Sequence, residues 1–237
     1  MLRAAVFVLA LSPAIVVAGD LETQLTEHAA VDWSRAEVRA RGSAPADLRA
    51  PSPAVARTKA LRQAVEQARG RLAAAIVRLP RANGSRVEKL DQRALAQILD
   101  SAAVVDRSFG SDGSAMVNLA IGTEAVRAAL EGPLAPGKSK VATIWVDARG
   151  LDLEPAVGVV VSAGGVRYQG PTVFYSSETA TRKDRRIARG KSARRTTGRM
   201  LVSGSVELDG IDESELRAAA SGSPLLVFLI KKARTSR

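Results

Sequence analysis

The 237-residue chain contains no cysteine, and this absence removes several kinds of chemistry at once. It excludes disulfide bonds, thiolate nucleophiles and zinc sites that are built on cysteine. The stability of the fold must therefore come from packing. No thiol is present to carry a lipid either, so we expect a mature protein without a covalent membrane anchor.

Histidine and aromatic residues are scarce as well. The single histidine, His28, excludes a pair of histidine ligands for a metal, and it excludes a Ser-His-Asp triad unless His28 is the base. Its place near the start of the chain favours a solvated surface residue. Aromatic residues make up 3% of the chain, which leaves few rings to stack on sugars or bases. We expect no cofactor and no metal site.

The first eighteen residues have the order of a secretory signal peptide. Arg3 gives a positive start, residues 4–17 form an apolar run, and small residues precede Gly19. The run is shorter than the roughly 20 residues of a membrane span. We therefore expect cleavage after Ala18, which makes residues 1–18 the signal peptide, and a periplasmic product. The alternative is an uncleaved N-terminal anchor helix.

Basic residues are concentrated in one segment of the chain. The formal net charge is +11, and residues 180–199 contain nine basic side chains against Asp184 alone. The simpler interpretation is a solvated loop between two strands that has no binding role. The functional one is a patch for an anionic envelope surface, such as lipid headgroups, acidic polymers or an acidic protein face, whereas nucleic acid is not expected outside the cytoplasm. The candidate anion-binding residues are Arg182, Lys183, Arg185, Arg186, Arg189, Lys191, Arg194 and Arg195.

Hydrophobic periodicity predicts two modules. We expect an N-terminal α/β module over residues 30–131, a proline- and glycine-rich linker over 132–140, and a mainly β module over 141–232 with a basic loop at 178–199. The expected fold class is α/β (α+β), with two small mixed or antiparallel sheets covered by helices.

The first module is predicted to be built around a long alanine-rich helix from Val55 to Leu79. A strand with an exposed face is expected over 33–42, a second helical pattern covers 87–99, and Thr123 is expected to cap a short helix. Runs at 104–109 and 115–121 flank a glycine-rich turn and predict a hairpin. The expected apolar face of the long helix is Leu61, Ala64, Val65, Ala68, Leu72, Ala75, Ile76 and Leu79.

The second module reads mostly as strands, with one short helix that begins near Asp212. The predicted strands are 141–148, 156–163, 166–168, 172–175, 200–208 and 225–231.

Residues 132–139 match the phosphate-loop pattern G-x-x-x-x-G-K-[ST]. A phosphate loop must leave a strand and enter a helix, so that backbone N–H groups face the phosphates. Here a helix is predicted before the pattern and a strand after it, and two prolines remove donors. We therefore interpret the segment as a linker.

Two stretches resemble a known family. The strand that ends at Gly42, the alanine-rich helix and the strands around Asp112 resemble the N-terminal α/β module of flagellar assembly protein T and of related small membrane-associated lipoproteins. Residues 146–156 resemble a stretch of secreted bacterial proteins that carry this module, and 211–216 with 225–230 resemble their usual ending. The resemblance implies an envelope structural or assembly protein, not an enzyme, and supplies no catalytic residues.

We therefore expect a non-catalytic periplasmic protein that binds or scaffolds parts of the cell envelope, with flagellar or outer-membrane assemblies as candidate partners. One alternative is an envelope hydrolase that uses carboxylates such as Asp147 or Asp209. Another is a protein that binds anionic polymers or lipids through the basic segment.

Overall fold

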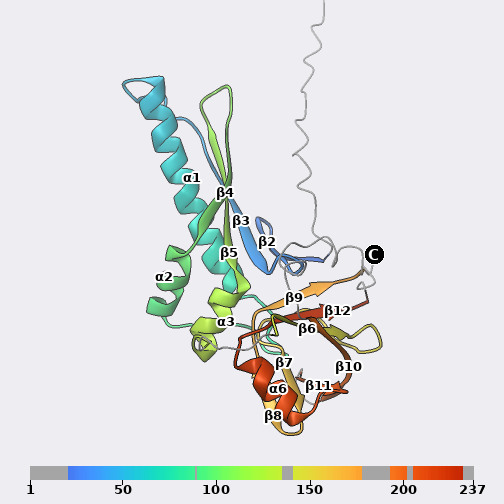
Figure 1. Cartoon of the computed structure of the whole chain (residues 1–237). Helices are drawn as coiled ribbons and strands as arrows, with labels where there is room; N and C mark the ends of the chain where they lie inside the picture. Colours follow the sequence, from blue (N-terminus) through green and yellow to red (C-terminus); the bar gives the residue numbers. More distant parts are fainter. Residues whose placement is uncertain (1–20, 89, 135–140, 178–192, 202–204, 232–237) are drawn as a thin grey trace, which may run out of the picture.

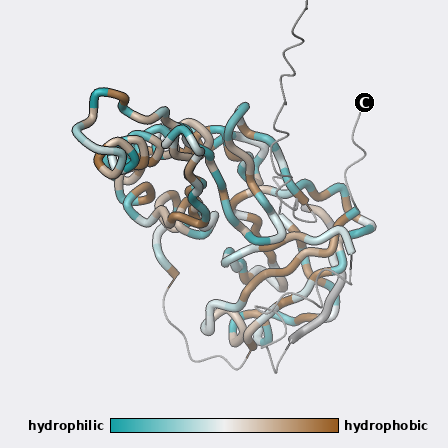
Figure 2. Tube along the Cα trace, turned by 90° about the horizontal axis from the view of Figure 1, so that it is seen from above, coloured by the Kyte–Doolittle hydropathy of each residue, from teal (hydrophilic) through white to brown (hydrophobic). Residues whose placement is uncertain are grey.

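The computed structural model describes residues 21–88, 90–134, 141–177, 193–201 and 205–231. They form a mixed α/β fold with two sheets, one covered by a long helix and one that curves below it (Figure 1). From above, the two sheets lie side by side, and hydrophobic and hydrophilic residues alternate along strands of the first (Figure 2). The expected fold class is confirmed.

The first sheet is antiparallel and has five strands in the order β1-β2-β3-β5-β4. One face packs on the long helix α1, which lies across β3 and β5, while the residues that alternate with the buried ones face away from it. The strands are β1 (Glu22–Thr26), β2 (Ala29–Asp32), β3 (Glu37–Ala44), β4 (Ala103–Phe109) and β5 (Ala115–Gly122), and the helices of this half are α1 (Pro53–Ile76), α2 (Gln92–Asp100) and α3 (Thr123–Glu131).

Helix α1 begins at a defined cap. The hydroxyl of Ser52 accepts a hydrogen bond from the Val55 backbone N–H at 3.3 Å, and Pro53 follows the cap, where its missing N–H costs nothing. Alanine recurs every four residues along the buried face, which keeps that face nearly flat. The buried residues are Ala56, Ala60, Ala64, Ala68, Leu72, Ala75 and Ile76.

This flat face lets the helix approach β3 at backbone distance. A Cβ atom on Gly42 would lie 2.0 Å from the Ala64 carbonyl oxygen and 2.6 Å from the Ala68 nitrogen. No side chain other than hydrogen fits there unless the helix moves. Gly42 therefore fixes how closely α1 lies over the sheet.

The predicted apolar face of α1 is only partly confirmed. Leu72 and its alanine neighbours are buried as expected, but Leu61 and Val65 are only half-buried. These two side chains lie on the flank of the helix toward β4, beyond the strip that β3 and β5 cover.

The second sheet has seven strands in the order β8-β7-β11-β10-β6-β12-β9 and is mixed. Its centre is parallel, since β6 pairs in parallel with both β10 and β12, whereas β10 and β11 form an antiparallel pair. The elements are β6 (Thr143–Asp147), β7 (Val160–Ala163), β8 (Val166–Gln169), β9 (Thr172–Tyr175), β10 (Ala193–Leu201), β11 (Ser205–Asp209), helix α6 (Glu213–Ala220) and β12 (Leu225–Leu229).

An aromatic chain connects the two sheets. The Trp33 ring meets the Phe174 ring edge-on at 5.9 Å, and Phe174 stacks on Phe228 at 5.5 Å. The Phe174 backbone N–H also donates to the Trp33 carbonyl at 3.1 Å, so β9 is joined to the end of β2. The larger of two hydrophobic core clusters therefore contains residues of both halves.

A buried arginine connects α3 to the residues around it. The Arg127 guanidinium is buried and forms a two-pronged ion pair with Glu124, and it donates to the Gly132 carbonyl at 3.1 Å. Glu131 lies 3.9 Å from Arg127 and also reaches Arg81 at 3.4 Å.

The side chain of Tyr168 lies near this cluster of charges. Burial and the negative charge of Glu124 raise the pKa of the Tyr168 hydroxyl well above its ordinary value, and the positive charge of Arg127 opposes them.

Several predicted boundaries need correction. The N-terminal module was predicted to begin at residue 30, but β1 lies before that residue and β2 begins at Ala29. The strand expected over 33–42 is β3, which begins at Glu37 after a turn. The cap of α3 is Gly122, not Thr123. The strand expected over 200–208 is two antiparallel strands, β10 and β11. Alternation continued through Val202-Ser203-Gly204 in the sequence and hid this break, which lies outside the described residues.

The basic loop expected over 178–199 ends earlier than predicted. Strand β10 begins at Ala193, so the backbones of Arg194 and Arg195 pair with β6 near the middle of the second sheet. The other six candidate residues, from Arg182 to Lys191, lie outside the described residues, as do 135–140 of the predicted linker. No described helix is both long and apolar enough to span a bilayer.

Replacing Gly42 by alanine tests the close approach of α1. The new Cβ would overlap the Ala64 carbonyl, so we expect a loss of about 2–3 kcal/mol in the free energy of unfolding, as in overpacked cores. Gly70→Ala is the matched control on the exposed side of the same helix, where a Cβ meets nothing within 4 Å. It should gain about 0.5–1 kcal/mol. Urea unfolding measures both, and an unchanged Gly42→Ala protein would contradict the packing.

The Tyr168 hydroxyl gives a prediction in alkaline solution. It donates to the Pro224 carbonyl at 2.7 Å, so Tyr168→Phe should cost about 1 kcal/mol at pH 7. Because the folded pKa is raised above 10.0, the unfolded chain releases this proton first, and the stabilisation is lost as the pH rises past about 10. Urea unfolding at pH 7 and pH 11 should show the difference between the two proteins shrinking. A constant difference would contradict the assignment.

Candidate functional site

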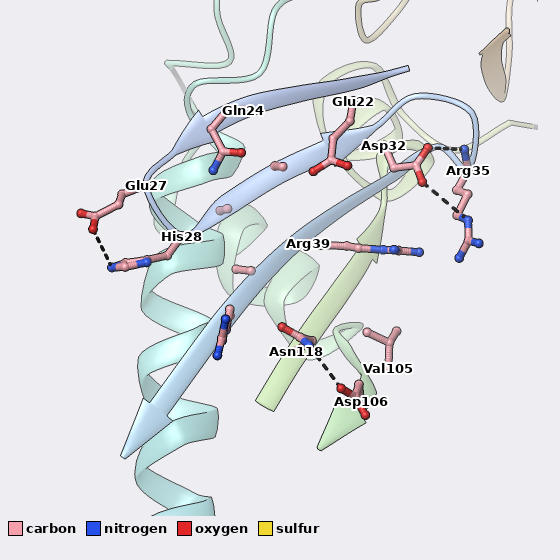
Figure 3. A pocket seen from close by; sticks show the side chains of 14 residues that line it. Glu22, Gln24, Glu27, His28, Asp32, Arg35, Arg39, Val105, Asp106 and Asn118 are labelled. Carbon is pink, nitrogen blue, oxygen red and sulfur yellow. Dashed lines mark hydrogen bonds and ion pairs between the residues drawn. The ribbon is translucent and has the colours of Figure 1, made fainter. Parts of the chain in front are cut away.

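The face of the first sheet that points away from α1 carries a shallow polar groove of about 570 Å³ (Figure 3). Alternation along the strands places these side chains opposite the buried ones. The groove is lined by Glu22, Gln24, Glu27, His28, Ala29, Ala30, Asp32, Arg35, Arg39, Ala40, Arg41, Val105, Asp106 and Asn118.

The charges of this groove are largely matched within it. Arg39 contacts Glu37 at 2.7 Å, and Arg35 lies 3.5 Å from Asp32. The Asp32 carboxylate also accepts from the Ser34 hydroxyl at 2.6 Å, so it stabilises the turn after β2. Pairs of this kind neutralise several of the charges on this face of the sheet.

His28 lies in the turn between β1 and β2 at the rim of this groove. Its side chain is exposed, and its Nε2 atom is 3.8 Å from the Glu27 carboxylate (Figure 3). No serine hydroxyl donates to it among the described residues. This arrangement agrees with the expected solvated surface residue.

A second groove, of about 540 Å³, runs between α1 and β4. Its helix side is formed by Leu61 and Val65, and its strand side by Val104, Val105, Asp106 and Arg107. Register places Val104 and Arg107 opposite Leu119 and Val117, on the face that α1 covers farther in. The helix stops short of this edge, so the groove is open to solvent.

Strand β4 is the open edge of the first sheet. It pairs only with β5 among the described residues, and all seven of its residues are exposed. Three large apolar side chains are far more exposed than usual: Val104 at 53%, Val105 at 49% and Phe109 at 45%. An edge strand offers unpaired backbone N–H and C=O groups to another chain. The strand thus combines a free edge with apolar side chains.

Arg107 lines the groove, and Arg57 and Arg62 lie close to Leu61 in the sequence of α1; none of the three has an ion pair to a described residue. Arg107 projects from β4 to the groove face. Arg57 lies one helical turn before Leu61, and its Cγ is 3.9 Å from where a Cβ on Gly113 would stand, at the hairpin turn. Arg62 follows Leu61. All three are exposed, whereas Arg69 farther along is held by Asp100 at 2.6 Å.

The carboxylates named for a hydrolase lie on strands that flank the middle of β10. Asp147 ends β6 and Asp209 ends β11, with β10 between them, so their backbones are roughly two strand spacings, or 10 Å, apart. Arg149 contacts Asp147 through two hydrogen bonds of 2.9 and 2.5 Å and lowers its pKa. A general acid needs a raised pKa, so Asp147 is poorly suited to that role.

The phosphate-loop pattern is flanked by the elements that the sequence predicts. Helix α3 ends at Glu131 before it and β6 begins at Thr143 after it, which is the reverse of a phosphate-binding order. Residues 135–139 of the pattern lie outside the described residues. Across the described part of the chain, no three histidine, aspartate or glutamate side chains gather as metal ligands would.

Comparison with known proteins adds no family to this picture. A scan of protein-family models gives no match to the chain, and a search of curated proteins gives none either. The resemblance to the flagellar assembly module therefore stays a prediction.

The α1–β4 groove was not predicted from the sequence, although its parts were. The hairpin and the apolar positions of α1 were both expected, but alternation does not reveal the order of strands in a sheet. One signal was available. The run Ala103-Val104-Val105 does not alternate with polar residues, as a strand with one buried face would.

Proposed function

We propose that this chain is a non-catalytic binding protein of the cell envelope, which holds another polypeptide at the β4 edge of its first sheet. The observation that carries the proposal is the exposure of all seven residues of β4, with no strand beyond it in the described structure. Monomeric proteins usually cover or shorten such an edge.

The other surfaces support binding less well. The polar groove on the far face is filled by side chains that pair with one another, as Arg39 does with Glu37. The opposite edge strand, β1, exposes Glu22, Thr23 and Gln24, which are polar. Apolar exposure at a free edge is therefore a property of β4 in this sheet, and such exposure commonly marks an interaction site.

The envelope location rests on the first eighteen residues of the sequence. Their resemblance to a signal peptide favours a periplasmic protein, and the family resemblance favours a part in flagellar or outer-membrane assembly. A role in assembly agrees with a surface that binds protein.

A second candidate function is retention on an anionic envelope surface. Nine basic residues against one acidic residue between 180 and 199 favour it. Arg194 and Arg195 belong to β10, so a test of this candidate that leaves β10 unchanged uses the basic residues before Ala193.

Photocrosslinking tests the β4 site directly. A photoreactive residue in place of Val105 should attach to one recurring peptide of another protein in intact cells, because this side chain is exposed at the sheet edge. Gln24 on β1 is the matched control, since it lies on the opposite edge strand of the same sheet. Mass spectrometry identifies the attached peptide and the mature N-terminus, expected at Gly19. Scattered peptides from both positions, or none at Val105, would refute the proposal.

Vesicle binding tests the second candidate. Replacing Arg182, Arg185, Arg186 and Arg189 with serine should remove most retention on anionic phospholipid vesicles at low salt, and rising salt should weaken the native protein in the same way. A control variant changes four exposed arginines elsewhere, at positions 49, 86, 93 and 167, and has the same net charge. Equal loss in both variants would show that total charge alone acts.

A further inference from the structure

We infer that the β4 edge receives an extended segment of a partner protein that adds a strand to the first sheet and presents alternating apolar and acidic side chains to the groove between β4 and α1. This inference rests on the proposed function and specifies the chemistry of the partner.

The shape of the groove requires an extended segment. Strand β4 has one side against β5 and the other side free, and α1 forms a wall one layer above through Leu61 and Val65. A strand paired beside β4 would direct every second side chain toward this wall. Apolar side chains at those positions would cover Leu61, Val65 and Val104, which are now partly exposed to water.

The charge around the groove requires acidic residues in that segment. Arg107 lines it and Arg57 lies one helical turn before Leu61, and neither has an ion pair to a described residue. Asp106, the acidic residue of β4, pairs in register with Asn118 and lies within 3.5 Å of it, on the far face of the sheet. A carboxylate opposite Arg107 would therefore meet a cation that has no ion pair to a described residue, and opposite charges directly across two strands stabilise their pairing.

A second copy of this chain fits the same edge poorly. Residues that lie directly opposite one another in an antiparallel pair share a face. A symmetric pair centred on β4 would set Asp106 against Asp106, and the two adjacent registers would set Arg107 against Arg107 or Val105 against Val105. Like charges directly opposite are destabilising, which disfavours the first two registers. The third is centred where the register of β4 shifts, so the edge is better suited to a different polypeptide.

Defined peptides test the inference on the full mature chain. The probe is the blocked heptapeptide Thr-Val-Thr-Glu-Thr-Val-Thr, which offers valine, glutamate and valine to one face, and the comparison peptide has lysine in place of glutamate. Fluorescence anisotropy should show that the glutamate peptide binds about tenfold more tightly, because one cross-strand attraction becomes a repulsion. Two further probes carry N-methyl groups on alternate amides, and one of the two should lose binding since its methyl groups face β4.

Arg107→Glu should reverse the preference so that the lysine peptide binds more tightly, while Arg167→Glu on β8 should leave it unchanged. Both residues are exposed, so both variants should fold, and thermal melting checks this. Equal binding of the two peptides would refute the acidic partner. Binding that survives both N-methylated forms, or no binding of any peptide, would refute strand addition.

These failures are distinguishable from failure of the proposed function. Crosslinks from Val105 to a partner whose attached peptide is not acidic, together with equal peptide binding, would leave β4 as the binding edge and overturn only its chemistry. Crosslinks from Val105 to a second copy of the chain would overturn the inference as well.

Discussion

The close contact between α1 and β3 at Gly42 determines most of what is distinctive in this structure. The helix can lie at backbone distance because its buried face is alanine and because residue 42 has no side chain. Close packing of this kind centres the helix on β3 and β5, with lesser contact to β1 and β2. A helix held farther away by larger side chains would cover more strands. The exposure of β4 is therefore a consequence of small residues two strands away.

An exposed apolar edge strand favours aggregation, because it can pair with other chains. Strand β4 carries two features that limit such pairing. Its register shifts between Val104 and Asp106, and charged residues follow at Asp106 and Arg107. Bulges and charges are common means by which proteins protect a sheet edge. Here they do not remove the apolar side chains on either side, so they restrict which strand can pair without closing the edge. If the edge binds a partner as proposed, the same features would make it selective for one strand over another.

Local sequence patterns predicted the elements better than their arrangement. The hairpin around Gly113 and the helix that contains Leu72 were visible because turn chemistry and helical spacing act over a few residues. Strand order and the parallel pairing of β6 with β10 and β12 depend on contacts between distant parts of the chain. The same limit explains why the sequence did not predict that Leu61 and Val65 are only half-buried. Their spacing marks them as apolar flank residues, but only the position of β4 decides whether a neighbour covers them.

The two halves of the chain do not act as independent units. Trp33 follows β2, packs edge-on against Phe174 and accepts a hydrogen bond from its backbone, so the first sheet continues into the core of the second. The chain has few aromatic residues, and three of them, Trp33, Phe174 and Phe228, pack together at this junction. A firm junction keeps β4 and β10, the strand that follows the basic segment, on one body, although they belong to different sheets. If both bind as proposed, a partner strand held at β4 would be fixed relative to an anionic surface, which is what a scaffold in the envelope requires.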